Sequence, residues 1–461
     1  MSDTREVADS SAQTKLADKP MPAGIKKVVA ASMAGTIAEW YEFFIYGTAA
    51  TLVFGTLYFP KSDNPLDGII AAFATYAIGF LARPIGGLVF GHFGDRVGRK
   101  KLLQISLLMV GVATFLMGCI PGFDAWGYWA PATLIALRFI QGFAVGGEWG
   151  GAILLVGEHS PNDQRGYWSS FPQAAACIGN VLATVVLLGL SWTLPADQFM
   201  AWGWRVAFWL SAVIIFIGYY IRRSVEEAPV FLASLEKQKE LKQEASGLKE
   251  VLTQYPKQVL LGVGARLGEN TVYYAIIVFS ITYLKLNVGM TNNEVLLIMF
   301  LANVVQFFVM ILGGKLSDII GRRKTYLIGA AGLFVWLFFY FPALNTGSFW
   351  IVFGAILFGL SMQALCYGPQ GALLAELFPT RMRYTGVSFC YQVTSIAAGS
   401  VAPMVCAALL SAWGTTTPII GYLFIVMAIS TVAILSYRET LGISLEDVDA
   451  ADESKFSPSM R

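Results

Sequence analysis

Twelve apolar stretches, each long enough to cross a lipid bilayer, occupy most of this 461-residue chain and limit what it can fold into. Hydrophobic residues make up 56% of the sequence and charged residues only 13%. A soluble protein of this length would need far more polar surface, so a soluble fold is excluded. We therefore predict an all-α integral membrane protein with twelve transmembrane helices, six in each half. The stretches lie at 28–58, 67–91, 102–121, 130–157, 167–193, 201–221, 258–284, 295–317, 325–343, 349–377, 384–412 and 418–437.

The segments outside these stretches define the expected organisation. The polar N-terminus ends in Lys26 and Lys27, and the apolar run that follows is too long for a signal peptide and lacks a small-residue cleavage site. That run is therefore expected to remain as the first span. The expected parts are a tail at 1–27, a six-helix bundle at 28–221, a Lys/Glu-rich linker with surface helices at 222–257, a second six-helix bundle at 258–437 and a short acidic tail at 438–461.

Positive charge is unequally divided between the two sides of the predicted spans. Lys and Arg concentrate in the loops that share a side with both termini, for example at 96–101 and 322–324. The opposite loops hold little beyond Lys61, Arg205 and Lys285. Because basic residues are retained in cytoplasmic loops, both termini are predicted to be cytoplasmic.

The sequence offers no residue set for enzymatic or metal chemistry. Five cysteines without a C-x-x-C pair and only two histidines indicate neither a disulfide framework nor a metal site. There is no P-loop sequence, and no set of nucleophile, base and orienting residue can be assembled. We therefore expect no enzymatic activity, no cofactor and no nucleic-acid partner.

Two loop motifs occur once in each half of the chain. Residues 91–101 (GHFGDRVGRKK) recur as 314–324 (GKLSDIIGRRK), a shift of 223 residues. Residues 158–165 (EHSPNDQR) recur as 376–383 (ELFPTRMR), a shift of 218 residues. Two similar six-helix halves with a solute site between them, near the bilayer midplane, are typical of alternating-access transporters.

These motifs resemble the major facilitator superfamily, whose signature G-x-x-x-D-R-x-G-R-[KR]-[KR] is matched in full at 91–101 and without its first Arg, at Ile319, in the second copy. The resemblance spans most of 28–437 and implies the major facilitator fold and proton-coupled uptake of a small solute. Further segments look like the metabolite:proton symporters, the group of α-ketoglutarate, shikimate and proline/betaine permeases: 39–43 (EWYEF), 80–87 (FLARPIGG), 138–142 (RFIQG), 146–151 (GGEWGG) and 376–386.

The first span carries a polar stripe. Ser32, Thr36, Glu39, Glu42 and Tyr46 recur every three or four residues and share one helix face, which is expected to look into the bundle. Glu39 and Glu42 repel each other at low dielectric, so at least one is expected to take up a proton near neutral pH. Either is therefore a candidate for proton coupling. The alternative is that both are ionised and tie helices together through arginines.

The seventh span carries a matching set, Arg266, Glu269, Asn270 and Tyr273, on one face. The spacing predicts an ion pair between Arg266 and Glu269. Arg266 is predicted to bind a solute carboxylate, with Glu269 setting its position or accepting the proton. The alternative is an ion pair that only stabilises the helix.

Two further arginines lie inside predicted spans, where charge is costly and usually functional. Arg83 lies 12 residues before Asp95, about 18 Å of helix from the cytoplasmic loop and near the bilayer centre. Its planar guanidinium suits a solute carboxylate, although Pro84 also allows an Arg that binds carbonyls freed by a helix break. Arg138, on one face with Gln141, resembles the basic residue that superfamily symporters use in proton coupling.

Other polar and aromatic side chains at helical spacing complete the expected site, although interhelical hydrogen bonds would explain each of them as well. Glu148, among closely spaced glycines, is expected to be structural. The predicted proton-coupling residues are Glu39, Glu42, Arg138 and Glu269; the solute-binding residues are Arg83, Arg266, Tyr46, Tyr76, Gln173, Asn270, Tyr273, Tyr274, Gln363, Tyr367 and Gln392; and the cytoplasmic gate residues, whose carboxylates are expected to pair with Arg or helix N-termini, are Asp95, Arg99, Glu158, Asp318, Arg322 and Glu376.

Together these features predict a monomeric, proton-coupled symporter of the bacterial inner membrane that imports a small organic acid, a mono- or dicarboxylate or a shikimate-like compound, by alternating access. The nearest alternative is a symporter of a zwitterionic osmolyte such as proline or betaine, or of an organic cation, held by Glu39, Glu42 and aromatic rings. A channel or membrane receptor is a second alternative, which the paired gate motifs disfavour. The expected partners are the solute, protons and the lipid bilayer.

Overall fold

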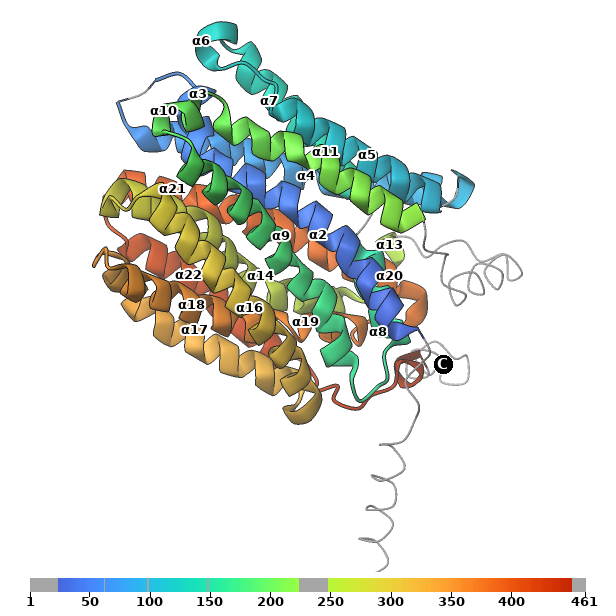
Figure 1. The fold of residues 1–461 in the computed structure, drawn as a ribbon. Coiled ribbons are helices and arrows are strands. Elements are labelled where there is room, and N and C mark those ends of the chain that lie inside the picture. The colour runs from blue at the N-terminus through green and yellow to red at the C-terminus, as the bar shows by residue number, and fades with distance from the viewer. Residues whose placement is uncertain (1–23, 62, 98, 147–148, 224–247, 450–461) are drawn as a thin grey trace, which may run out of the picture.

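The computed structural model describes residues 24–61, 63–97, 99–146, 149–223 and 248–449, which form helices and no strand (Figure 1). Helical segments occupy each of the twelve predicted spans. The N-terminal half contains α2 (Ile25–Ala49), η1 (Ala50–Phe54), α3 (Gly55–Leu57), α4 (Pro65–Val97), α5 (Arg99–Met117), α6 (Phe123–Trp126), α7 (Trp129–Val145), α8 (Trp149–His159), α9 (Arg165–Thr193), α10 (Ala196–Gln198), η2 (Phe199–Gly203) and α11 (Trp204–Arg223).

The C-terminal half repeats this arrangement of long helices. It contains α13 (Leu248–Gln254), α14 (Pro256–Tyr274), η3 (Ala275–Phe279), α15 (Ser280–Tyr283), η4 (Leu284–Val288), α16 (Asn292–Ile320), α17 (Arg322–Leu344), α18 (Phe349–Tyr367), α19 (Gln370–Ala375), α20 (Thr380–Thr394), η5 (Ser395–Ser400), α21 (Val401–Trp413) and α22 (Thr417–Leu435). The η elements are π-helical turns. Most of the predicted tails, 1–23 and 450–461, and of the linker, 224–247, lie outside the described residues.

The predicted all-α membrane architecture is confirmed. Within the described residues, nine helical segments are long and apolar enough to cross a bilayer, and α5 and α7 supply shorter apolar helices. The helix α9 packs along both α2 and α16, and Figure 1 shows α9 and α16 side by side, with α5, α7 and α11 on one side of them and α17, α18 and α22 on the other. The two halves therefore meet along α9 and α16.

Glycines bring α4 and α7 into backbone contact. A Cβ added at Gly142 would lie 1.8 Å from the carbonyl oxygen of Gly79, and one added at Gly146 would lie 1.9 Å from the carbonyl oxygen of Arg83. Only glycine allows so close an approach. The contact holds Arg83 of α4 beside Arg138 of α7. The neighbouring Gly147 and Glu148 lie outside the described residues.

We expect Gly142→Ala to lower the free energy of unfolding by about 1–3 kcal/mol, because the new methyl group meets backbone that cannot move aside. The matched control is Gly189→Ala in α9, where an added Cβ meets nothing within 4 Å. It should leave stability unchanged or raise it by up to about 1 kcal/mol, since alanine favours the helix. Thermal unfolding of the purified variants measures both, and equal midpoints would contradict the assigned contact.

Candidate functional site

Arg83 lies between two phenylalanine rings near the centre of α4. Its Cζ is 4.8 Å from the ring centroids of both Phe43 and Phe80, and the residue is only 3% exposed. No carboxylate among the described residues forms an ion pair with Arg83, and its Nε has no hydrogen-bond partner there. A buried cation without a counter-ion is costly, so this guanidinium would be stabilised by a bound anion.

Arg138 lies against the same group of rings. Its Cζ is 4.3 Å from the ring centroid of Tyr46, 4.7 Å from that of Tyr76 and 4.9 Å from that of Phe43. One nitrogen donates to Gln141, while Nε and Nη2 have no hydrogen-bond partner among the described residues. A cationic solute would need free aromatic ring faces, but Arg83 and Arg138 already cover the faces of these rings.

The polar stripe of the first span is buried as predicted, with Glu39 at 7% and Glu42 at 1% exposure. Glu42 Oε2 contacts the hydroxyl of Thr114 and lies 3.5 Å from Gln141 Nε2, whereas Oε1 has no hydrogen-bond partner among the described residues. A cavity of about 10 Å³, room for about one water molecule, is lined by both glutamates and by Arg83 and Arg138.

The C-terminal half holds a second buried cation. Arg266 forms the predicted ion pair with Glu269, at 3.9 Å, and donates to Gln370 Oε1 at 3.1 Å. Its Cζ also lies 3.7 Å from the ring centroid of Tyr391 and 5.3 Å from that of Tyr367. Arg266 is thus held by charge, amide and ring together.

Glu269 is fully engaged, in contrast to Glu42. It accepts hydrogen bonds from Gln363 Nε2 at 2.6 Å and from Gln370 Nε2 at 3.1 Å. Gln363 was a predicted solute-binding residue, and in this structure its N–H is directed to Glu269. The carboxylate therefore has donors on both oxygens as well as Arg266 beside it.

The remaining predicted site residues lie at the contact between the halves or are buried near it. Gln173 Nε2 of α9 donates to the carbonyl oxygen of Tyr367 at 3.5 Å. The ring centroid of Tyr274 is 6.2 Å from that of Phe43, and Tyr273 is at the same distance from Phe44. Buried polar atoms without a hydrogen-bond partner among the described residues occur at Tyr76 (Oη), Gln173 (Oε1), Asn270 (Nδ2) and Gln392 (Oε1).

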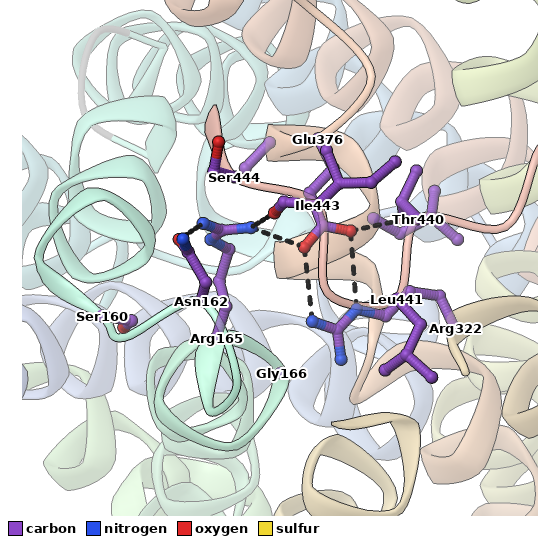
Figure 2. Close-up of polar contacts among 12 residues, drawn as sticks. Ser160, Asn162, Arg165, Gly166, Arg322, Glu376, Thr440, Leu441, Ile443 and Ser444 are labelled. Atoms are coloured by element: carbon purple, nitrogen blue, oxygen red, sulfur yellow. Dashed lines mark hydrogen bonds and ion pairs between the residues drawn. The ribbon is translucent and has the colours of Figure 1, made fainter. Parts of the chain in front are cut away.

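A buried carboxylate, Glu376, joins the two halves at the end of the helices where the repeated loop motifs lie (Figure 2). Its Oε1 lies 2.8 Å from Arg165 Nη1 of the N-terminal half and 3.3 Å from Arg322 Nη2 of the C-terminal half. The hydroxyl of Thr440 donates to Oε2 at 2.5 Å. The predicted gate carboxylate thus bridges two arginines.

The other loop motif, in its second copy at 314–324, closes the same end through a helix N-terminus. Asp318 accepts hydrogen bonds from the backbone N–H groups of Gly166, at 2.9 Å, and Tyr167, at 2.7 Å, and pairs with Arg322. These N–H groups begin α9, whose positive end favours the carboxylate. A Cβ added at Gly314 would lie 2.5 Å from the carbonyl oxygen of Gly166, so the motif glycine permits this contact.

The first copies of the motifs are placed differently from the second. Glu158 pairs with Arg383 at 3.4 Å, but its side chain is 35% exposed, whereas that of Glu376 is fully buried. The side chains of Asp95 and Arg99, the predicted gate residues of the first loop, lie outside the described residues. The ion pairs of Glu158 and Glu376 are therefore unequal, although their sequence motifs repeat.

The segment after the last span also makes contacts with the loop-motif residues, which the sequence analysis did not predict. Arg165 Nη1 donates to the carbonyl oxygen of Ile443 at 3.1 Å. Glu439 accepts from the backbone N–H groups of Arg322 and Arg323, and Asp449 accepts from that of Thr380. The acidic composition of 438–461 was the only signal in the sequence.

Neutral hydrogen bonds join the halves at the opposite end of the helices. Asn64 Nδ2 donates to Ser411 Oγ at 2.8 Å, and Ser191 Oγ donates to Asn293 Oδ1 at 2.7 Å. A cavity of about 230 Å³ lies beside the second contact. The halves are thus bridged at both ends, by ion pairs on one side and by neutral groups on the other.

Comparisons with known proteins agree with this arrangement. The family model described as "Sugar (and other) transporter" matches residues 27–451. The inner membrane metabolite transport protein YhjE of Escherichia coli (strain K12) is 43% identical over 91% of this chain and 95% of its own length. The shikimate transporter of the same strain is 36% identical over 84% of this chain and 88% of its own length, and its proline/betaine transporter is 31% identical, over 93% and 86%.

Among solved structures, the MFS proton:xylose symporter XylE bound to 6-bromo-6-deoxy-D-glucose matches with a TM-score of 0.73, covering 94% of this chain and 100% of its own. The two sequences are only 19% identical, so this likeness concerns the fold. It agrees with two helical bundles that meet along α9 and α16.

Proposed function

The chain belongs to the sugar (and other) transporter family of the major facilitator superfamily and is a multi-pass membrane transporter of metabolites, and on this premise we propose that it is a proton-coupled symporter. It imports a small organic acid across the bacterial inner membrane by alternating access, with both termini in the cytoplasm. It is not an enzyme.

The observation that carries the proposal is buried positive charge that forms no ion pair with a carboxylate among the described residues. Arg83 and Arg138 are 3% and 1% exposed, and neither forms an ion pair with a described carboxylate. Breaking or omitting one partner of a buried ion pair costs about 3–5 kcal/mol. A solute carboxylate would offset that cost. Its bidentate fit to a guanidinium supports an acid as the solute.

Arg266 supports the same solute from the other half. Its guanidinium lies on the ring of Tyr391, and Gln370 fixes its orientation. An acid bound between Arg83 and Arg266 would contact both halves at once. Such a solute would couple its own binding to the closure of the two bundles.

Hydrogen counting supports Glu42 as the proton site. The Thr114 hydroxyl lies at hydrogen-bond distance from the carbonyl oxygen of Val110, at 2.9 Å, and also contacts Glu42. The same Thr114 hydroxyl oxygen accepts a hydrogen bond from Gln141 Nε2 at 2.6 Å. The single hydrogen of the Thr114 hydroxyl cannot be donated both to Val110 and to Glu42. If Glu42 carries a proton and donates it to Thr114, every one of these contacts has one donor and one acceptor.

Proton binding would then be linked to the inner gate. With Glu42 protonated and an acid on the arginines, the buried region is neutralised and the loaded carrier can change conformation. Opening the inner side requires Glu376 to separate from Arg165, and Asp318 from the start of α9. These contacts belong to the closed inner side, and their rupture is the step that releases the solute.

A zwitterionic osmolyte is the second candidate, because the proline/betaine transporter is a relative. A quaternary ammonium group binds best over aromatic faces. In this chain Arg83 and Arg138 occupy the faces of Phe43, Tyr46 and Tyr76. A betaine would have to displace them, which favours the acid.

Uptake by the full chain in liposomes tests the proposal. Labelled shikimate, α-ketoglutarate, proline and glycine betaine are offered with and without an imposed inward proton gradient. We expect gradient-stimulated accumulation of an organic acid, about tenfold for each proton and each pH unit, because one pH unit is worth about 1.4 kcal/mol. Accumulation of glycine betaine alone would overturn the proposed solute, and gradient-independent flux would remove the proton.

A further inference from the structure

Two glutamine amides link Glu269 to the other half of the molecule. Gln363 Nε2 donates to Glu269 Oε2 at 2.6 Å, and Gln306 Nε2 donates to Gln363 Oε1 at 2.9 Å. At the far end, Cys177 Sγ of α9 lies 3.5 Å from Gln306 Oε1. Gln306, in α16, is fully buried and was not a predicted site residue. A row of buried hydrogen bonds thus runs from Glu269 to the contact between the halves.

The direction of these hydrogen bonds depends on the charge of Glu269. With the carboxylate ionised, both amide N–H groups point toward it, as they do here. A protonated Glu269 that donated to Gln363 would require both amides to turn round. Gln306 would then donate to the sulfur of Cys177, which is a weak acceptor. The observed directions of these hydrogen bonds are therefore those expected for an ionised Glu269.

The other carboxylate oxygen of Glu269, Oε1, is also held as a hydrogen-bond acceptor. Gln370 Nε2 donates to Glu269 Oε1 at 3.1 Å, while Gln370 Oε1 accepts from Arg266 at 3.1 Å. Turning this amide would direct its N–H groups at the guanidinium, where two donors would oppose each other. Both oxygens of Glu269 are thus held as acceptors.

Among the described residues, one charged group and several neutral groups surround Glu269. On its own helix it faces Arg266 and Tyr273, while α17 contributes Tyr326 and α18 contributes Cys366 and Tyr367. The Tyr326 hydroxyl donates to a backbone carbonyl at 2.5 Å, and the Cys366 thiol donates to another at 3.5 Å. Among the described residues, only Arg266 forms an ion pair with Glu269.

From this geometry we infer that Gln306 is a positioning residue. Through Gln363 it fixes the direction of the hydrogen bonds and keeps Glu269 ionised as the standing counter-ion of Arg266. This inference rests on the proposed function, to which it adds a division of roles. Glu269 orients the arginine that receives the solute acid, and the first-span carboxylate carries the proton.

Infrared difference spectra of the full chain in liposomes, recorded over a pH titration without solute or gradient, test the inference. The spectra of the unmodified protein and of the single variant Glu269→Gln should show the same titrating carboxyl bands, because Glu269 stays ionised. In Gln306→Leu, Glu269 should begin to titrate, giving a protonated-carboxyl band that Gln306→Leu combined with Glu269→Gln lacks. Asn303→Leu is the matched control: it removes a buried amide of the same helix that contacts Asn180 of α9 but not Gln363, and should give no such band.

A second variant covers the case in which Gln306→Leu does not fold. In Gln306→Glu an ionised carboxylate at position 306 can only accept, so Gln363 turns its N–H toward it and its carbonyl toward Glu269, which then binds a proton. The band is assigned to Glu269 only where adding Glu269→Gln removes it. The inference is overturned if the unmodified protein already shows a band that depends on Glu269, or if neither Gln306 variant gains one. Because no solute is used, a negative uptake assay leaves this result intact, and failure here leaves the uptake assay standing.

Discussion

Glu42→Gln should abolish proton-driven accumulation while solute exchange continues. Glutamine resembles the protonated acid, so the loaded carrier can still form and change sides. It cannot release a proton, however, and the empty carrier can no longer be driven by the gradient. Accumulation should fall from about tenfold for each pH unit to the level set by the solute gradient alone. Gradient-driven uptake and counterflow in liposomes measure the two activities separately.

Two variants make this result specific. Glu446→Gln makes the same chemical change at an exposed position after the last span, and should retain both activities. Glu39→Gln changes the other first-span glutamate, which also lines the cavity beside Arg83 and Arg138. Loss of accumulation in Glu39→Gln with its retention in Glu42→Gln would transfer the proton site to Glu39. Loss of exchange together with accumulation in Glu42→Gln would show a structural role instead.

Glu376→Gln should destabilise the closed inner side by about 3–5 kcal/mol, because it leaves Arg165 and Arg322 buried without their shared counter-ion. Thermal unfolding of the purified protein should report the loss. The halves should also separate at this end, which the proposed orientation places in the cytoplasm, so a single cysteine placed at Ser160 should react faster with a membrane-impermeant thiol reagent in inside-out vesicles. Both readouts are needed, since unfolding alone would not distinguish a gate from a packing contact.

The repeated motif supplies the matched control. Glu158→Gln alters the equivalent pair with Arg383, but the side chain of Glu158 is 35% exposed. Water screens and replaces such an exposed pair, so the expected cost is only about 0–1 kcal/mol. Equal losses in the two variants would contradict the asymmetry that the structure gives to the two halves.

Spacing along the helices was enough to predict two features of the candidate site. The ion pair between Arg266 and Glu269 and the burial of the first-span stripe follow from the 3.6-residue period, and both are present. Partners on other helices could not be found in this way. Thr114 beside Glu42 and Gln306 beside Gln363 come from sequence-distant spans, and no periodicity relates them.

The predicted gate residues show the same limit of prediction from sequence. The repeats marked Glu158 and Glu376 as equivalent, and only the packing of the halves made the first about one-third exposed and the second a buried bridge. The contacts of Glu439 and Ile443 also depend on where the chain turns after α22. Such contacts depend on distances between helices, which are not encoded in the order of residues along any one of them.

By itself the sequence determined the membrane class, the succession of twelve helical spans, the duplication and the family, because apolar length and local motifs are properties of continuous segments. The tertiary structure alone decided which buried charges are matched. Among the described residues it left Arg83 and Arg138 without an ion pair, gave each oxygen of Glu269 a hydrogen-bond donor, and placed Glu376 between two arginines. The physical reason is that the energy of a buried charge depends on its nearest neighbours in space, and these come from helices far apart in the chain.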